Sequence, residues 1–390
     1  MRSILIGQSG GPTAIINVSL AGAICQARSD GFKRILGMRN GVQGALEGRL
    51  VELTALDDQA LERLKRTPSA ALGSCRYKLQ AGDADRLVAL CKEERVDAFV
   101  YIGGNDSADT SRQVALAADS AGLQLRVVGV PKTVDNDLPV TDHCPGYGSA
   151  ARFVAQVTRE TALDTVAMRT TDPIRLMEVM GRHAGWLAGA AWLGKERADD
   201  APHLVYLPER PRSIEQIVAD VRRVYDALGW CIVVLCENQP TPDGHIIGAI
   251  GEPRWRDAFG HAYFDSPAQA LSQRLQEELR VRVRFDKPGT IQRMATAYVS
   301  VTDRAEAELV GRAAVTLATA GSSGVMVTLE RQPGPDYAVR TGTTALEIVA
   351  NQQKRLPGEF IATSGNGMTD AFVAYATPLI GEPLPTFQRF

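Results

Sequence analysis

The sequence predicts an α/β protein built on parallel sheets, because short buried strands alternate with helices along the chain. Residues 96–102 and 231–236 are apolar or nearly so, and each run is too short for a typical helix. Continuously apolar strands are typical of parallel sheets that are covered on both faces. At 390 residues, the chain is long enough for two domains with separate cores.

The composition is that of an ordinary globular enzyme, with 45% hydrophobic residues, 23% charged residues and a net charge of −2. This balance gives no support for a nucleic-acid or membrane partner. No apolar run approaches the ~20 residues of a membrane span, and the amino terminus lacks the pattern of a signal peptide. The 6 cysteines are scattered, which favours reduced thiols in a cytoplasmic protein.

The amino-terminal part repeats one layout, in which a strand runs through a glycine-rich turn into a helix. A strand at residues 3–6 leads into Gly7-Gln-Ser-Gly-Gly-Pro-Thr13, and the strand at 96–102 leads into Gly103-Gly-Asn-Asp-Ser107. This layout can form an anion site at the helix amino terminus. The first turn lacks the motifs of a P-loop and of a dinucleotide fingerprint. A shorter strand at 34–38 and a polar loop at 72–78 lie between the two units.

The strand at residues 127–130 ends at Pro131 in a loop that carries one lysine and two carboxylates. Ligands of open α/β sheets bind beyond the carboxyl ends of the strands. Lys132 can hold a phosphate, while Asp135 and Asp137 can divide the work of general base and of orienting a hydroxyl or a metal. A β-turn with Asx caps is the alternative. Since three strands end in such loops, the sequence favours a phosphate site.

A second α/β unit follows a turn at residues 145–148 and a helix to about residue 163. Its strands at 174–179, 204–207 and 231–236 are followed by Arg182, Glu209 and Glu237. Each residue alone can be a surface salt-bridge partner, but three at equivalent strand ends favour a cleft.

The remaining elements are expected in a simple order. Ser213-x-x-Gln216 predicts a capped helix, and residues 281–285 alternate as a strand. We then expect the following elements: a strand near 297–301, a helix at 304–318, a strand at 325–329, a helix at 344–353 and a loop-rich tail.

Several short motifs follow one another at defined spacings: Gly10-Gly11 with Asn17, Gly73-Ser-Cys-Arg76, Gly103-Gly-Asn-Asp-Ser107, Pro131-Lys-Thr-Val-Asp-Asn-Asp137, Met180-Gly-Arg182, Glu237 and Gln292-Arg293. In this order, they resemble the phosphofructokinase family over most of the chain. The resemblance implies two Rossmann-like three-layer α/β domains with the active site in the cleft between them.

The domain ranges implied are residues 1–145 plus about 290–340 for the phosphoryl donor, and 146–289 plus about 341–390 for the sugar phosphate. Family members are typically oligomers, so we expect a homodimer or homotetramer with sites shared between subunits. The substrates implied are pyrophosphate and fructose 6-phosphate, in a reversible step of glycolysis.

The resemblance also implies roles for individual residues. Asp135 is expected to be the base that takes the proton from the sugar 1-hydroxyl, with Asp137 orienting the same end of the sugar and Lys132 acting on the donor. The sugar site is expected to comprise Thr133, Met180, Gly181, Arg182 and Glu237. Arg293 is expected to hold the 6-phosphate, with Arg284 reaching across from a neighbouring subunit. The residues expected to face the donor are Gly11, Arg76, Gly104, Asp106 and Lys132.

The same comparison predicts pyrophosphate as the donor. ATP-using members carry glycine where this chain has Asp106 and Lys132. A carboxylate at position 106 repels a nucleotide α-phosphate, whereas a lysine at 132 can bind the end of pyrophosphate. Mg²⁺ is the implied cofactor, with Asn105 and Asp106 as candidate ligands. Since Asn105 stands where the family often has an aspartate, Asp135 and pyrophosphate itself are expected to contribute.

Three alternatives remain open from the sequence. Thr290 stands where ATP-using members have a histidine, and Met294 follows Gln292-Arg293 where the family has a glycine. Another ketose phosphate, such as sedoheptulose 7-phosphate, is therefore an alternative substrate. An ATP-dependent 6-phosphofructokinase is the second alternative, and a catalytically silent sugar-phosphate sensor is the third.

Overall fold

The computed structural model describes residues 2–249, 255–256, 262–263 and 265–388. The chain divides into two compact units, Met1–Tyr147 with Arg293–Lys354, and Gly148–Gln292 with Arg355–Phe390. Residues 341–354 therefore lie in the first unit, and not in the second as the expected ranges had them. The reason is that β13 (Val339–Ala345) pairs with a strand of the first unit along its whole length.

The first unit is built on a seven-stranded sheet in the order β13-β12-β5-β4-β1-β2-β3. The five inner strands are parallel, and β3 and β13 are antiparallel edge strands. The bounds of the strands not yet given are β1 Ser3–Gln8, β2 Arg34–Met38, β3 Leu50–Glu52, β4 Ala98–Gly103, β5 Arg126–Pro131 and β12 Val325–Arg331. Parallel pairing brings the polar loops after β1, β4 and β5 to one edge of the sheet.

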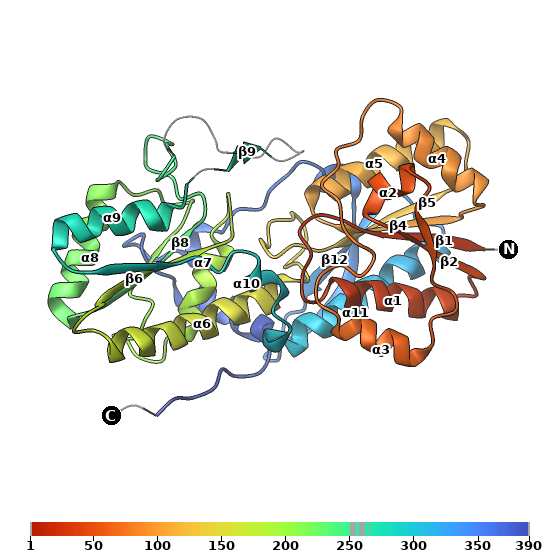
Figure 1. Ribbon diagram of the computed structural model, residues 1–390. Coiled ribbons are helices and arrows are strands. Elements are labelled where there is room, and N and C mark those ends of the chain that lie inside the picture. The colour runs from red at the N-terminus through yellow and green to blue at the C-terminus, as the bar shows by residue number, and fades with distance from the viewer. Residues whose placement is uncertain (1, 250–254, 257–261, 264, 389–390) are drawn as a thin grey trace. The chain divides into compact units, whose positions relative to one another are not determined.

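Helices cover both faces of this sheet, so the first unit has three layers (Figure 1). Alternate residues of each strand supply the two cores, and in β1 Ile4 and Ile6 point to one core and Leu5 to the other. The helices of this unit are α1 Ile16–Ser29, α2 Gly41–Leu46, α3 Asp58–Arg66, α4 Asp83–Glu93, α5 Asn105–Ser120, α11 Val301–Thr319 and α12 Leu346–Val349. A Cβ added at Gly311 of α11 would lie 2.1 Å from the carbonyl oxygen of Ser19, so glycine permits the close packing of α11 on α1.

The second unit contains a four-stranded, fully parallel sheet in the order β11-β6-β8-β7. Its strands are β6 Ile174–Val179, β7 Leu204–Tyr206, β8 Cys231–Cys236 and β11 Val283–Asp286, and a two-stranded ribbon pairs β9 Trp255–Arg256 with β10 Ala262–Tyr263. The helices are α6 Tyr147–Ala167, α7 Trp186–Ala190, α8 Ile214–Leu228, α9 Pro267–Leu279, α10 Ile291–Met294 and α13 Asp370–Ala376. Figure 1 shows α8 and α9 on one face of this sheet and α6 on the other.

Most local expectations are confirmed, and two are wrong. The capping box predicted at Ser213 is present, with Ser213 Oγ accepting from Gln216 N at 3.2 Å. The strand expected at 297–301 is instead a 3₁₀ turn, Thr296–Tyr298, followed by α11, whose amino terminus is capped by Ser300. The helix expected at 344–353 is reduced to α12, because the preceding residues extend β13.

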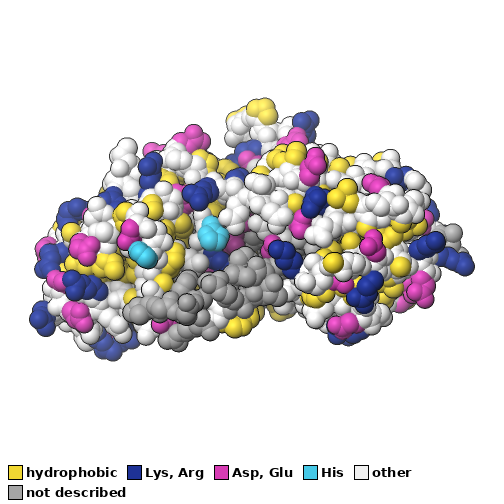
Figure 2. All heavy atoms as spheres, turned by 90° about the horizontal axis from the view of Figure 1, so that it is seen from above, with side chains coloured by type: hydrophobic (Ala, Val, Ile, Leu, Met, Phe, Trp, Pro, Cys, Tyr) yellow, Lys and Arg dark blue, Asp and Glu magenta, His cyan; other side chains and the backbone are white. Residues whose placement is uncertain are grey.

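Charged side chains of both signs are interspersed on the face seen in Figure 2. Such mixing agrees with the net charge of −2. Among the residues that the structure describes, no helix has both the length and the apolar character needed to cross a bilayer.

Candidate functional site

Lys132 lies at the end of β5 and is buried, with 2% of its surface exposed. Its Nζ donates to the carbonyl oxygen of Gly11 at 2.9 Å, and a Cβ at Gly10 would lie 3.2 Å from Nζ. The glycine turn after β1 therefore lies directly against this lysine. Burial lowers the pKa of Lys132 to about 7, and the positive charges of Arg293 and Arg76 act in the same direction. A site of concentrated positive charge of this kind is suited to an anion.

The two carboxylates of the loop after β5 flank Asn136, which has a left-handed backbone (φ 54°) and is fully buried. Asp135 N donates to Thr133 Oγ1 at 3.1 Å. Burial and, after it, the negative charge of Asp135 raise the pKa of Asp137 to about 7. Asp137 is therefore partly protonated at neutral pH, and a close pair of carboxylates that holds one proton leaves the other carboxylate able to accept one.

Three of the residues expected to face the donor or to bind the metal, Gly104, Asn105 and Asp106, lie at the start of α5. Asp106 is in the first turn, two residues after Gly104, and the favourable helix dipole acts on its carboxylate there. A Cβ at Gly104 would lie 3.7 Å from the carbonyl oxygen of Lys132, so this turn and the Lys132 loop are neighbours. Asn105 Oδ1 accepts from Asp106 N at 2.9 Å, and its Nδ2 donates to Gln352 O at 3.4 Å.

These residues offer few side-chain oxygens as ligands for a metal ion. Among the residues that the structure describes, no group of three His, Cys, Asp or Glu side chains is placed to hold an ion. Mg²⁺ commonly takes one or two carboxylates together with substrate phosphates and water. Asp106 fits this mode of binding, with the neutral Asn105 oxygen as a weaker second ligand.

The structure places Arg293 among the residues expected to face the donor. A Cβ at Gly11 would lie 2.8 Å from Nη1 of Arg293, and Ala14 N donates to the carbonyl oxygen of Arg293 at 2.7 Å. Arg76 follows Cys75, whose carbonyl oxygen accepts from Gly10 N at 3.2 Å. Gly11, Lys132, Arg76 and Arg293 are therefore brought together in the first unit.

A second group of predicted residues assembles in the second unit, where β6 and β8 end side by side. Their parallel register pairs Val179 with Cys236, so Met180-Gly-Arg182 and Glu237 follow adjacent strand ends. Arg182 Nε lies 3.8 Å from Glu237 Oε1. Gly181 has φ 121°, and a Cβ there would lie 2.6 Å from Ala184 O, so only glycine fits this turn.

Arg284, a further predicted sugar-site residue of the second unit, does not follow these two strand ends. It lies on β11, where the parallel register places it beside Arg175 near the start of β6. Its Nε forms an ion pair with Asp172 at 2.6 Å. Arg182, by contrast, follows the carboxyl end of β6. Because a parallel strand rises by roughly 3.3 Å per residue, Arg182 lies well beyond Arg284 along the strand direction.

The structure shows contacts of three further residues that position the predicted ones. Gln292 Oε1 accepts from Met180 N at 3.1 Å, and Lys354 N donates to Asp137 O at 2.6 Å. Glu209 accepts from Gly185 N at 3.0 Å and from Leu356 N at 3.0 Å. Burial raises the pKa of Glu209. Gln292 belongs to the motif Gln292-Arg293 and Glu209 follows a predicted strand, so the sequence signalled both. Sequence reasoning missed Lys354, which nothing local marks.

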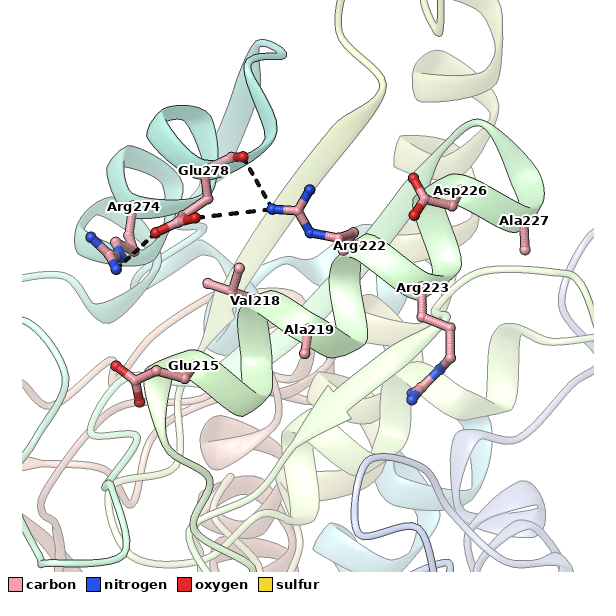
Figure 3. A pocket seen from close by; sticks show the side chains of 9 residues that line it. All are labelled: Glu215, Val218, Ala219, Arg222, Arg223, Asp226, Ala227, Arg274 and Glu278. Atoms are coloured by element: carbon pink, nitrogen blue, oxygen red, sulfur yellow. Dashed lines mark hydrogen bonds and ion pairs between the residues drawn. The ribbon is translucent and has the colours of Figure 1, made fainter.

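A pocket on the outer side of α8 and α9 contains none of the predicted residues (Figure 3). Its charged lining residues are three arginines (Arg222, Arg223 and Arg274) and three carboxylates (Glu215, Asp226 and Glu278). Arg274 Nη2 lies 2.8 Å from Glu278 Oε1, and Arg222 Nη2 donates to the carbonyl oxygen of Glu278 at 3.1 Å. The equal numbers of the two signs leave the pocket without the excess positive charge of the Lys132 region.

Comparison with known proteins gives concordant matches. Residues 3–318 match the family model described as Phosphofructokinase. A Xanthomonas campestris pv. campestris protein named pyrophosphate–fructose 6-phosphate 1-phosphotransferase is 40% identical over 98% of this chain and 92% of its own. An Alkalicoccus urumqiensis protein named sulfofructose kinase is 35% identical over 90% of each chain. The crystal structure of pyrophosphate-dependent phosphofructokinase from Nitrosospira multiformis matches with a TM-score of 0.89 and 36% identity, covering 99% of this chain and 94% of that one.

Proposed function

This chain belongs to the phosphofructokinase family, and we propose that it transfers a phosphoryl group from pyrophosphate to the 1-hydroxyl of fructose 6-phosphate. The products are fructose 1,6-bisphosphate and phosphate. The observation that carries the proposal is the group of Lys132, Arg76 and Arg293 around the glycine turn after β1. The carboxylate pair Asp135 and Asp137 lies on the same loop as Lys132. The near-full-length similarity to proteins named for this reaction supports it.

Asp135 acts as the general base in this proposal. A sugar hydroxyl becomes a good nucleophile only as its proton is accepted. Asp137, whose raised pKa of about 7 leaves it partly protonated at neutral pH, donates a hydrogen bond to the same end of the sugar in its protonated form. Phosphoryl transfer depends on positioning and on cations around a charged transition state, and Lys132 supplies one of those cations.

We assign the donor end of the site to the glycine turn, Arg76, Lys132 and the start of α5. When bound, Mg²⁺ would neutralise phosphate charge there, held by Asp106 and Asn105. Lys132 has its pKa lowered to about 7 by burial, and an adjacent anion favours its charged form. The lysine therefore takes up a proton as pyrophosphate binds near neutral pH.

A coupled assay with pyrophosphate, with ATP and with no donor tests the proposal directly. Turnover of fructose 6-phosphate is expected with pyrophosphate and not without a donor. The same assay is to be run with sedoheptulose 7-phosphate, since Thr290 and the similarity to a protein named sulfofructose kinase leave the sugar less constrained. Absence of turnover with every donor and sugar phosphate would contradict an enzymatic role.

Arg182 is expected to anchor the sugar phosphate. Charge-assisted hydrogen bonds contribute about 1.5–3 kcal/mol each, so Arg182→Ala should raise KM for fructose 6-phosphate by roughly 10- to 150-fold. Steady-state kinetics with each substrate varied in turn provides the measurement. Arg222→Ala, on the outer face of α8, is the control and should leave both KM values unchanged. If Arg182→Ala changes only the KM for pyrophosphate, Arg182 belongs to the donor site.

Steady-state kinetics of Arg293→Ala, with each substrate varied in turn, decides whether Arg293 belongs to the sugar-phosphate site or to the donor site. We expect KM for fructose 6-phosphate to rise, as for Arg182→Ala. Arg293 lies against Gly11 of the glycine turn, and this contact favours the other assignment, in which Arg293 binds pyrophosphate. An effect confined to pyrophosphate would move Arg293 to the donor site.

Arg284 is proposed to serve the site of a neighbouring subunit in a homodimer or homotetramer. The motivation is its position on β11, away from Arg182 in its own chain. Mixing inactive Arg284→Ala subunits with inactive Asp135→Asn subunits should restore part of the activity, because hybrids contain some intact sites. Arg282→Ala, which also loses an ion pair to Asp172, is the matched control. If verified subunit exchange restores no activity, the shared site is wrong.

A further inference from the structure

His143 is buried in the first unit, and both of its ring nitrogens lie against carboxylates. Nδ1 lies 2.8 Å from Oδ1 of Asp142, and Nε2 lies 2.6 Å from Oε2 of Glu306 on α11. A neutral imidazole has only one N–H, so its other nitrogen would direct a lone pair at a carboxylate. Only an imidazolium donates from both nitrogens. The geometry therefore favours a positively charged histidine at this position.

The first carboxylate, Asp142, is surrounded by cations. Nη2 of Arg331, on β12, lies 3.1 Å from Asp142 Oδ1. Lys354 Nζ donates to the carbonyl oxygens of Thr141 and Asp142 at 2.9 and 2.8 Å. Despite burial, hydrogen bonding and charge from His143 keep the pKa of Asp142 below its usual value. Asp142 is thus an ionised partner for the histidine.

The second carboxylate, Glu306, accepts from two sides. The hydroxyl of Tyr337 donates to Glu306 Oε1 at 2.5 Å and lies 3.4 Å from His143 Nε2. Asp303, one turn earlier on α11, accepts from Gly146 N at 2.8 Å. Burial by itself would lower the pKa of His143, but Asp142 and Glu306 outweigh it and raise that pKa above its usual value.

Residues 141–146, here termed the clasp segment, connect this network to the loop after β5, residues 132–137, here termed the catalytic loop. Cys144 N donates to Asn136 Oδ1 at 2.9 Å, and Asn136 is the buried residue between Asp135 and Asp137. Thr133 N donates to Pro145 O at 3.3 Å. The clasp segment thus lies along the catalytic loop and is fastened to α11 at two points, through His143 and through Gly146.

We propose that His143, as an imidazolium, is a positioning residue that fastens the clasp segment to α11 and thereby holds Asp135 and Asp137 in their working geometry. The inference rests on the proposed function, because that function makes these aspartates the reacting pair. Losing the proton turns one of the two charge-assisted hydrogen bonds into a repulsive contact. The clasp segment, along which the loop of Asp135 and Asp137 lies, then loses one of its two attachments to α11.

The sign of the pH dependence follows from the raised pKa of His143. Its contribution to the stability of the clasp segment is complete below the ordinary histidine pKa of about 6.5. The contribution is lost as pH rises through the higher folded-state pKa. We therefore expect kcat of the wild-type protein to fall on the alkaline side as His143 deprotonates.

Two variants test the proposal. In His143→Gln the amide can reach only part of the network and does not titrate, so kcat should fall by about 10- to 100-fold through misplacement of the aspartates, with KM for fructose 6-phosphate little changed. Glu306→Gln keeps the shape but removes one carboxylate charge, so the alkaline limb of kcat should move to lower pH. His203→Gln in the second unit is the control, since His203 lies outside this network and its Nδ1 accepts a hydrogen bond from the backbone N–H of Ile232.

Two measurements without substrate separate this proposal from the proposed function. Amide hydrogen exchange of residues 133–147 should be faster in His143→Gln than in the wild type at the same pH, and unchanged in His203→Gln. The histidine resonance that disappears in His143→Gln should titrate above the ordinary pKa in the wild type. Should His143→Gln fail to fold, Glu306→Gln carries both readouts. Unchanged exchange, or a His143 resonance titrating at or below the ordinary value, would overturn the inference whichever substrate the enzyme uses.

Discussion

Replacing Asp135 with asparagine is expected to lower the forward rate by roughly 10²- to 10⁴-fold, the range typical for loss of a general base. The amide keeps the size and shape of the carboxylate but cannot accept the proton of the sugar hydroxyl. KM for fructose 6-phosphate should change much less, since the lost interaction forms as the proton moves. The measurement is steady-state kinetics of the purified variant with pyrophosphate as donor.

Two controls limit the interpretation of that result. Asp119→Asn, at the exposed end of α5, removes a carboxylate outside the site and should leave kcat unchanged. Asp137→Asn removes the other member of the pair, whose pKa of about 7 leaves it partly protonated at neutral pH, and the neutral amide resembles that protonated form. We expect it to lower kcat less than Asp135→Asn. Near-normal turnover in Asp135→Asn would remove Asp135 from the role of base.

Donor choice is the second large effect, and the wild type is expected to use pyrophosphate with little activity toward ATP. A carboxylate within ~4 Å of a nucleotide α-phosphate repels it by on the order of 4 kcal/mol at an effective dielectric near 20. That energy corresponds to roughly a thousandfold in affinity. Asp106→Gly should relieve the repulsion and raise the efficiency with ATP relative to pyrophosphate. Lys132→Gly should weaken the use of pyrophosphate.

The matched control for Asp106→Gly is Asp109→Gly, on the same helix. Both introduce glycine near the start of α5, and interior glycine costs roughly 1 kcal/mol of helix stability. Only the change at 106 should alter the ratio of kcat/KM for the two donors. A wild type that prefers ATP would refute the donor assignment. An unchanged ratio in Asp106→Gly would leave donor choice to Lys132.

The helix and strand pattern was largely predictable because its signals are local. The apolar runs that became β4 and β8, and the capping box at Ser213, specify their elements from neighbouring residues alone. The errors fall where distant pairing decides the outcome. Residues 339–345 form β13 because β12 offers an open edge, and no pattern within the segment reveals that edge.

At the site, the order of residues along the chain specifies which residue types follow each strand, and parallel pairing requires their loops to share one edge of a sheet. Which side chains touch depends on the packing of segments that are far apart along the chain. This packing places Arg293 against Gly11, Lys354 against Asp137, and Glu306 against His143, 163 residues apart along the chain. Burial in that environment, and not residue type, raises the pKa of Asp137 and lowers that of Lys132. Such contacts and desolvation depend on how whole helices and sheets pack, so no local pattern can encode them.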